Sequence, residues 1–215
     1  MLLRLLRMAE RDGASCAGLV LLIGAVFAVG FVRLLQEGFQ LSPQQSLRLL
    51  VLAMLHLVGP MVVALIAFTR LTPQWLRRGR GGGPYGGLLT LGPAFLVGPL
   101  LLIHALMGAL AAWALASAQG GVELGLAHAV GAIVPMDLFT ALLRTALYLA
   151  AAALLCLWEG QRRPQNPAAA DALIGSLIAR EIALMVGLKL IWTLAVNRAI
   201  SRASTVSATS QVRPG

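Results

Sequence analysis

Apolar side chains follow one another along this chain in stretches long enough to cross a lipid bilayer as helices. A bilayer core takes about 20 apolar residues in a helix. Five stretches come close to or exceed that length, and they run over residues 14–32, 49–68, 88–118, 138–158 and 173–196. The third is too long for one perpendicular span, and Pro93 and Pro99 interrupt it. The pattern predicts an all-α integral membrane fold with five transmembrane helices, in a domain over residues 13–197.

The first twelve residues have a different, amphipathic pattern. On a helical wheel, one face carries Leu2, Leu5, Leu6 and Ala9, and the opposite face carries Arg4, Arg7 and Arg11. This is typical of a helix in the lipid head-group layer, so residues 1–12 are predicted to be an interfacial helix. The charged start of a cleaved signal peptide is the alternative, although no small-residue cleavage site follows. The Ser/Thr-rich residues 198–215 are predicted to be a disordered tail.

Composition supports a membrane protein and excludes two other classes. Hydrophobic residues make up 59% of the 215 residues and charged residues 12%, where a soluble domain has about 25% charged residues. This leaves too little polar surface for a soluble particle, and disordered chains are poor in apolar residues. The net charge of +9 does not indicate nucleic-acid binding, because the arginines lie at the ends of apolar stretches rather than in one patch.

The basic residues also predict an orientation. The amino terminus and the loops 70–87 and 159–172 would share one side of a five-span protein and hold nine basic residues, against five on the other side. Because basic residues concentrate on the cytoplasmic side, the amino terminus is expected to be cytoplasmic. Loop 70–87 is basic and then glycine-rich, with Trp75 as its expected anchor at the membrane interface. A short helix over 122–137 is expected on the outer side.

The sequence offers little catalytic chemistry, and no enzyme activity is expected. It has no zinc-protease, nucleophile-elbow or phosphate-loop motif. His56 and His104 stand alone on their stretches and are expected to pack rather than to bind a metal. Charge inside an apolar stretch is costly and indicates function, which makes Glu181 and Lys189 candidates. If the fifth span begins near Ala183, Glu181 lies in the head-group layer instead, whereas Lys189 is deeper and is expected to face a subunit interface or a polar cavity.

Prolines inside apolar stretches predict broken helices. Gly59-Pro60 in the second stretch and the two prolines of the third remove helical hydrogen bonds, and the freed carbonyls need partners. This favours helices packed around one another or around a cavity. A small-residue pair that begins at Gly108 adds a weak indication of close helix packing.

Several short motifs occur in a characteristic order. Residues 55–70 read LHLVGPMVVALIAFTR, with Gly59-Pro60, Ala64-Leu65 and a closing Arg70. Asp137-Leu138 opens the fourth stretch, Leu143-Arg144-Thr145 follows, residues 156–160 read CLWEG, and the small-residue-rich segment 168–176 enters the last stretch. In this order and spacing, residues 1–197 resemble the MlaE (YrbE) permease family. Its members are the membrane subunits of ABC-type transporters that move lipids between bacterial membranes with MCE-domain proteins.

The resemblance implies a permease subunit in the bacterial inner (cytoplasmic) membrane. It implies a phospholipid cavity at a dimer interface, and the positions that correspond to its wall are His56, Leu57, Gly59, Pro60 and Met61. It also implies three protein partners: a cytoplasmic ATPase, an MCE-domain protein and a second permease subunit, identical or paralogous. ATP would bind the ATPase, and no cofactor is expected in this chain.

Two departures from the family pattern leave an alternative open. The family has an Arg-Glu pair where this chain has His56-Leu57. The family's cytoplasmic coupling segment is acidic, whereas the corresponding loop here carries Arg70, Trp75, Arg77 and Arg78 and no acid. The alternative function is therefore a non-transporting scaffold or pseudo-permease subunit of a membrane complex.

Overall fold

The computed structural model describes residues 2–80, 87–116, 127, 130–131, 133–162 and 170–211, and no strand occurs within them. The elements are α1 (Leu2–Arg33), the π-helical turn η1 (Leu34–Gly38), α2 (Pro43–Ala53), the π-helical turn η2 (Met54–Val58), α3 (Gly59–Arg80), α4 (Leu88–Ala116), α6 (Pro135–Arg162) and α7 (Ala170–Gln211). The predicted all-α class is confirmed for this part of the chain. The helix expected over 122–137 lies mostly outside it.

Four helical segments are long and apolar enough to cross a membrane: Leu3–Gly38, Pro43–Gly79, Leu88–Ala116 and Pro135–Arg162. They contain the first four predicted spans, so the chain has the build of an all-α membrane protein. The predicted fifth span lies in α7, which is not among the four segments. The four segments were found among the described residues, and the side chains of α7 from residue 195 onward are not among these.

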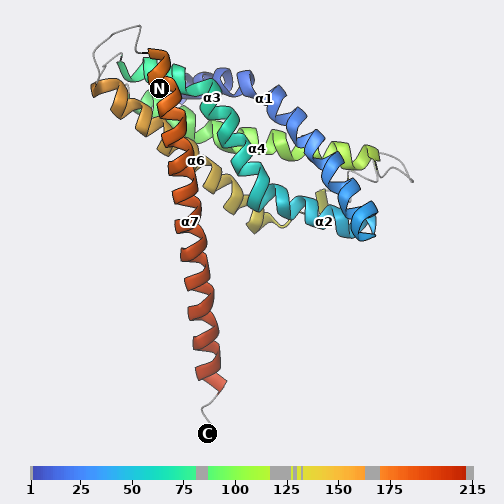
Figure 1. The fold of residues 1–215 in the computed structure, drawn as a ribbon. Helices are drawn as coiled ribbons and strands as arrows, with labels where there is room; N and C mark the ends of the chain where they lie inside the picture. Colours follow the sequence, from blue (N-terminus) through green and yellow to red (C-terminus); the bar gives the residue numbers. More distant parts are fainter. Residues whose placement is uncertain are drawn as a thin grey trace.

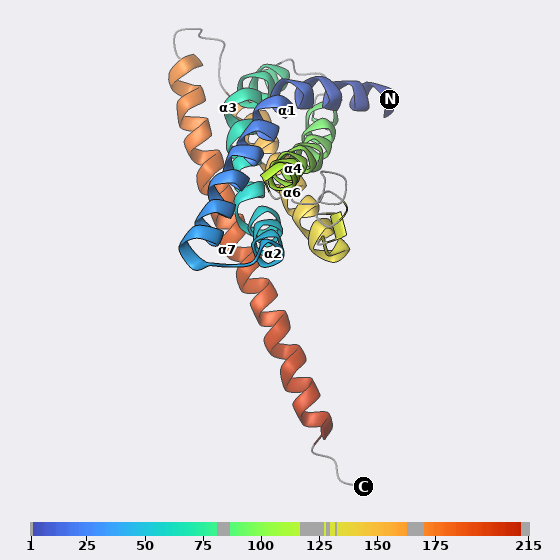
Figure 2. The same cartoon turned by 90° about the vertical axis from the view of Figure 1, so that its right-hand side faces the viewer.

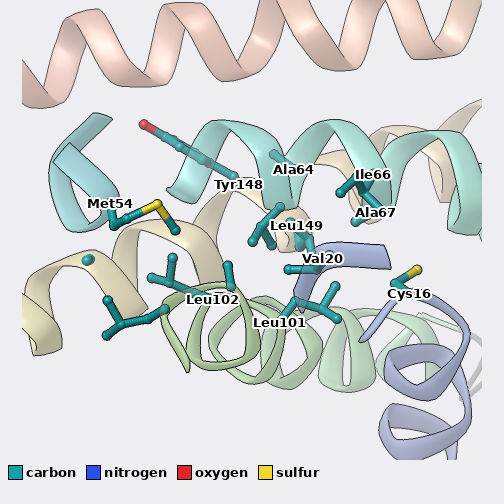
Figure 3. Packing of buried hydrophobic residues seen from close by; sticks show 14 of the residues in the cluster. Cys16, Val20, Met54, Ala64, Ile66, Ala67, Leu101, Leu102, Tyr148 and Leu149 are labelled. Carbon is teal, nitrogen blue, oxygen red and sulfur yellow. The ribbon is translucent and has the colours of Figure 1, made fainter. Parts of the chain in front are cut away.

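The helices form a bundle with α7 on one side. α1 packs against α4, and α6 packs against both α3 and α4. α2 and α3 follow one another through η2 with a change of direction, and α7 runs along the bundle and extends well beyond it (Figure 1). Residues of α1, α3, α4 and α6 together form the apolar core, part of which Figure 3 shows around Val20, Ala64, Leu101 and Leu149.

The predicted boundary between an interfacial helix and the first span does not appear as a break. α1 is one continuous helix, but its first turns bend away from the rest of its length (Figure 2). Ser15 Oγ donates a hydrogen bond to Asp12 O at 2.7 Å, and serine hydroxyls that bond back to the helix often accompany such bends. The amphipathic segment 1–12 is thus the bent start of a long helix rather than a separate element.

The second span begins earlier than predicted, at a capped helix start. Gln45 N–H donates to Ser42 Oγ at 3.3 Å, and Ser42 N–H donates to Gln45 Oε1 at 3.1 Å. Pro43 occupies the first helical turn, where its missing N–H costs nothing. This capping box satisfies two otherwise unpaired donors, so the helix begins before the apolar residues do.

The prediction of a loop from residue 70 is wrong for residues 70–80, which are the last turns of α3. Pro73 lies inside the helix without ending it. Phe68, Leu71 and Trp75 are all buried, so the buried face keeps its helical spacing of three and four residues past the apolar stretch. Trp75 is fully buried and is therefore a core residue, not the interfacial anchor that was expected.

The helical backbone of α7 continues into the segment predicted to be a disordered tail, and the disorder itself stays a prediction. α7 is helical to Gln211, so only the last residues of the segment 198–215 lie outside the helix and outside the described chain. Extending an existing helix adds one hydrogen bond for each residue fixed.

Glycines bring α1 and α4 into backbone contact. A Cβ atom on Gly24 would overlap the backbone of Ala105, and a Cβ on Gly108 would overlap the backbone of Leu21. Each helix thus presents a glycine to the main chain of the other. Such close approach is the usual source of attraction between helices in lipid, where burial of apolar surface gives little driving force.

This contact generates a stability prediction for two positions on one helix. Gly24→Leu is expected to lower the free energy of unfolding by at least about 1–3 kcal/mol, because overpacking forces the two backbones apart. Gly18→Leu is the matched control, since nothing lies within 4 Å of a Cβ there. Thermal unfolding in detergent would measure both variants, and equal melting temperatures would contradict the proposed contact.

Candidate functional site

A buried arginine on α6 lies where the second span is interrupted. Arg144 is only 7% exposed, and its Nη1 donates a hydrogen bond to the main-chain oxygen of His56 at 3.1 Å. In a regular helix that carbonyl would accept the N–H of residue 60, but Pro60 has none. The expectation that a proline-freed carbonyl needs a partner is therefore met by a side chain from another helix.

The interruption itself is a π-helical turn. η2 spans Met54–Val58, and Gly59 N–H donates to Met54 O, five residues back. Gly59 is buried tightly here, because a Cβ would overlap Met54 O and the side chain of Leu102. π-Turns inside α-helices are rare and occur frequently at functional sites. The Gly-Pro pair of the sequence thus produces a local distortion that places residues 54–58 against α6.

The His56 side chain faces an acid at the start of α6. Its Nε2 lies 3.6 Å from Asp137 Oδ1, and the two side chains are 36% and 40% exposed. The contact is an ion pair only when the imidazole is protonated. His56 thus contacts the start of α6 through its ring and the middle of α6 through its carbonyl oxygen.

Helix α7 adds two residues to the same region. Lys189 Nζ lies 3.3 Å from the sulfur of Met61, and the guanidinium carbon of Arg144 lies 5.4 Å from the ring centroid of Trp192. A cation over an indole face is attracted by the ring's quadrupole. We call the group formed by His56, Asp137, Arg144 and Lys189 the Arg144 site; it joins η2, α6 and α7.

The Arg144 site has more positive than negative charge. Arg144 and Lys189 are cations, whereas Asp137 is the single carboxylate and lies beside His56. Arg144 Nε and, one turn further along α6, the hydroxyl of Tyr148 are buried without a hydrogen-bond partner. A buried charge is normally paired. Within the described side chains, no carboxylate pairs with either Arg144 or Lys189.

A second polar cluster lies around Glu181. Its carboxylate is fully buried and accepts hydrogen bonds from Thr72 Oγ1 at 2.7 Å and from Cys156 Sγ at 2.8 Å. The neighbouring Arg180 is half exposed and pairs with Glu159 at 2.6 Å. Whether Glu181 lies in the apolar core or in the head-group layer of a membrane stays open, because its burial is against other helices of the chain. Glu181 and Lys189, predicted together, have separate partners.

The predicted coupling residues divide into two groups. Arg78 forms a two-pronged ion pair with Asp12, with both N–O distances 2.7 Å, and Asp12 is 1% exposed. Arg78 therefore connects the end of α3 to the bend of α1, and Trp75 packs in the core. Arg70 and Arg77 are exposed. These two remain available to a partner, while the other two hold the bundle together.

The residues expected to line a lipid cavity have different surroundings. Leu57 is 52% exposed on the outside of η2, Gly59 and Pro60 are buried, and Met61 is half-buried against Lys189. An apolar groove of about 730 Å³ lies elsewhere, between the start of α1 and α4. Its lining includes Leu6, Ala9, Glu10, Leu96, Leu100 and His104. None of the five expected residues lines this groove.

The donor sets do not fit a metal site. No group of three or more His, Cys, Asp or Glu side chains that could hold an ion occurs in the described part of the chain. His104 uses Nδ1 to contact Leu100 O of its own helix at 2.7 Å. Both cysteines are buried and free. The chemistry on offer is therefore charge and hydrogen bonding inside an apolar bundle.

A comparison with protein-family models and with curated proteins finds no match to this chain. The function of the site is therefore inferred from the positions and contacts of its side chains. In the sequence, Arg144 stands out only as the middle residue of the Leu143-Arg144-Thr145 motif. Its position seven residues after Asp137, inside an apolar stretch, was the available indication, because charge there is costly.

Removing the arginine side chain tests its structural role. Arg144→Leu is expected to lower the free energy of unfolding by about 1–3 kcal/mol, because it leaves the buried His56 carbonyl unpaired. Pro60→Ala supplies an N–H four residues after His56, so Arg144→Leu should cost less in that background. Unfolding of the two single variants and the double variant in detergent measures the coupling. If the losses in free energy of unfolding are strictly additive, Arg144 does not replace the N–H that Pro60 lacks.

Proposed function

We propose that this chain is a permease-type subunit of an ABC-type phospholipid transporter in the bacterial inner membrane, with its amino terminus in the cytoplasm. The supporting observation is that two stretches that carry the family resemblance meet in space. Arg144 of the Leu-Arg-Thr motif donates to the carbonyl that the Gly59-Pro60 motif leaves without an N–H. Motifs far apart in the sequence thus build one distorted, polar region.

The chemistry of that region suits an amphipathic substrate. A phospholipid has apolar chains and a charged phosphate, and the Arg144 site places cations beside exposed apolar side chains such as Leu57 and Leu190. Broken helices that line a polar region are a recurring feature of transporter substrate sites. The proposed substrate cavity forms where this face meets a second permease subunit, identical or paralogous.

The proposed partners are a cytoplasmic ATPase that binds ATP and an MCE-domain protein on the other side of the membrane. Arg70 and Arg77 are exposed at the end of α3, on the side of the membrane assigned to the cytoplasm. Because residues 70–80 carry no acid, the complementary surface of the ATPase would be acidic. Charge reversal at these two positions would then weaken assembly.

A second candidate function is a non-transporting scaffold subunit. The observation that favours it is the engagement of Arg78 by Asp12 and the burial of Trp75. Half of the predicted coupling residues are thereby occupied within the chain. A scaffold would keep the bundle and its membrane partners without direct contact between α3 and an ATPase.

Purification of the tagged chain in mild detergent, with mass spectrometry of proteins and lipids, tests the proposal. An ATPase, an MCE-domain protein and phospholipid are expected together. The double variant Arg70→Glu/Arg77→Glu should recover about tenfold less ATPase, because reversed charges repel an acidic partner. Arg48→Glu, an exposed arginine at the opposite end of the second span, is the control.

The possible outcomes separate the two functions. Recovery of the chain as a homo-oligomer without an ATPase would contradict the proposed transporter function. Recovery of the complex with an ATPase that is insensitive to the double variant would favour the scaffold.

A further inference from the structure

We propose that Arg144, Lys189 and Tyr148 bind the phosphate group of a membrane phospholipid, which enters the bundle between η2, α6 and α7. The inference deepens the proposed function, on which it rests for the class of substrate, by assigning the residues that hold the head group. It is carried by three observations: a buried cation that no described carboxylate neutralises, unpaired donors beside it, and partly exposed polar neighbours.

None of the acidic side chains in the described part of the chain neutralises Arg144. The acidic side chains within the described part are Glu10, Asp12, Glu37, Asp137, Glu159 and Glu181. Asp12 pairs with Arg78, and Glu159 pairs with Arg180. Glu181 accepts its hydrogen bonds from a hydroxyl and a thiol. None of these six carboxylates contacts Arg144 or Lys189.

Asp137 is the nearest acid along α6, and it is too far away to neutralise Arg144. It precedes Arg144 by seven residues, which corresponds to about 10.5 Å along a helix axis. It shares the face of α6 with Arg144, because seven residues complete almost two turns. Its carboxylate lies beside His56 instead. Asp137 therefore leaves the charge of Arg144 without a carboxylate partner.

Unpaired donors lie at and near Arg144. Arg144 Nη1 donates a hydrogen bond to the His56 carbonyl, while Arg144 Nε is buried without a partner. The hydroxyl of Tyr148 is buried and unpaired as well, and Figure 3 shows it pointing away from Leu149 toward the side on which α7 lies. Lys189 has only a thioether as its neighbour, which is a weak acceptor. An oxyanion with several acceptor atoms would satisfy all three groups.

Part of the site lies at the surface of the described chain. His56 and Asp137 are 36% and 40% exposed, and Lys189 is half-buried. Exposed apolar side chains, among them Leu57 and Leu190, flank these residues and would contact acyl chains. A phosphate attached to acyl chains thus fits better than free phosphate. Arginine binds phosphate through paired, charge-assisted hydrogen bonds.

Retention of phosphatidylglycerol by the full chain tests the inference. The purified protein is incubated with this lipid in detergent, separated by gel filtration, and its phosphorus is measured in the organic and the aqueous extract. Wild-type protein should retain organic phosphorus. Arg144→Gln keeps a donor for the His56 carbonyl, and it should retain about tenfold less lipid because the charge is lost. Lys189→Met should show a similar loss.

Two further variants make the comparison specific. Arg48→Gln removes an exposed arginine away from the site and should leave retention unchanged. Arg144→Lys restores a positive charge without the planar guanidinium and should recover part of the loss. Gel-filtration profiles identical to wild type show that each variant is folded. If Arg144→Gln unfolds, Lys189→Met, which leaves the His56 contact intact, decides the result.

The outcomes that would contradict the phosphate site differ from those that would contradict the proposed transporter function. Unchanged lipid retention in both Arg144→Gln and Lys189→Met would contradict the phosphate site, and so would phosphorus confined to the aqueous extract. Loss of dimerisation in these variants, with lipid retained, would show that a carboxylate of a second copy neutralises Arg144. Lipid retention that depends on Arg144 in a chain that recovers no ATPase would support the phosphate site and contradict the ABC-type function.

Discussion

The hydrogen bond from Arg144 to the His56 carbonyl is the contact on which the rest of this region depends. Pro60 removes the helical donor for that carbonyl, and an unpaired carbonyl among apolar helices is costly. A guanidinium supplies the missing N–H, but it brings a charge that the apolar surroundings disfavour. Trp192 offsets part of that cost from α7. The same contact thus fixes α6 against η2, draws α7 to the bundle, and creates the need for an anion.

Polar contacts at the other end of the helices have a purely structural character. Asp12 and Arg78 satisfy each other in a two-pronged pair that joins α1 to α3. Glu181 joins α7 to α3 and α6 through Thr72 and Cys156. Each of these carboxylates has its partners within the chain. The contrast with Arg144, whose Nε has none, is what separates a structural contact from a candidate binding site.

Packing and charge together explain how far the sequence could predict the structure. Long apolar stretches gave the first four spans, because bilayer thickness fixes their length. The end of α3 was missed because Trp75 and Leu76 continue a buried helical face that average hydropathy does not detect. Gly59-Pro60 correctly indicated a break. The sequence could not show that Arg144 lies opposite it, since 88 residues separate Arg144 from His56 and only the fold brings them together.

The most direct test of the account is an experimental structure of the chain in nanodiscs that contain phosphatidylglycerol. The account predicts a phosphate group within hydrogen-bond distance, about 2.7–3.2 Å, of the Arg144 guanidinium, with Lys189 turned from Met61 toward it. Acyl-chain density alone beside Arg144, or a carboxylate of a second copy in the phosphate position, would contradict it.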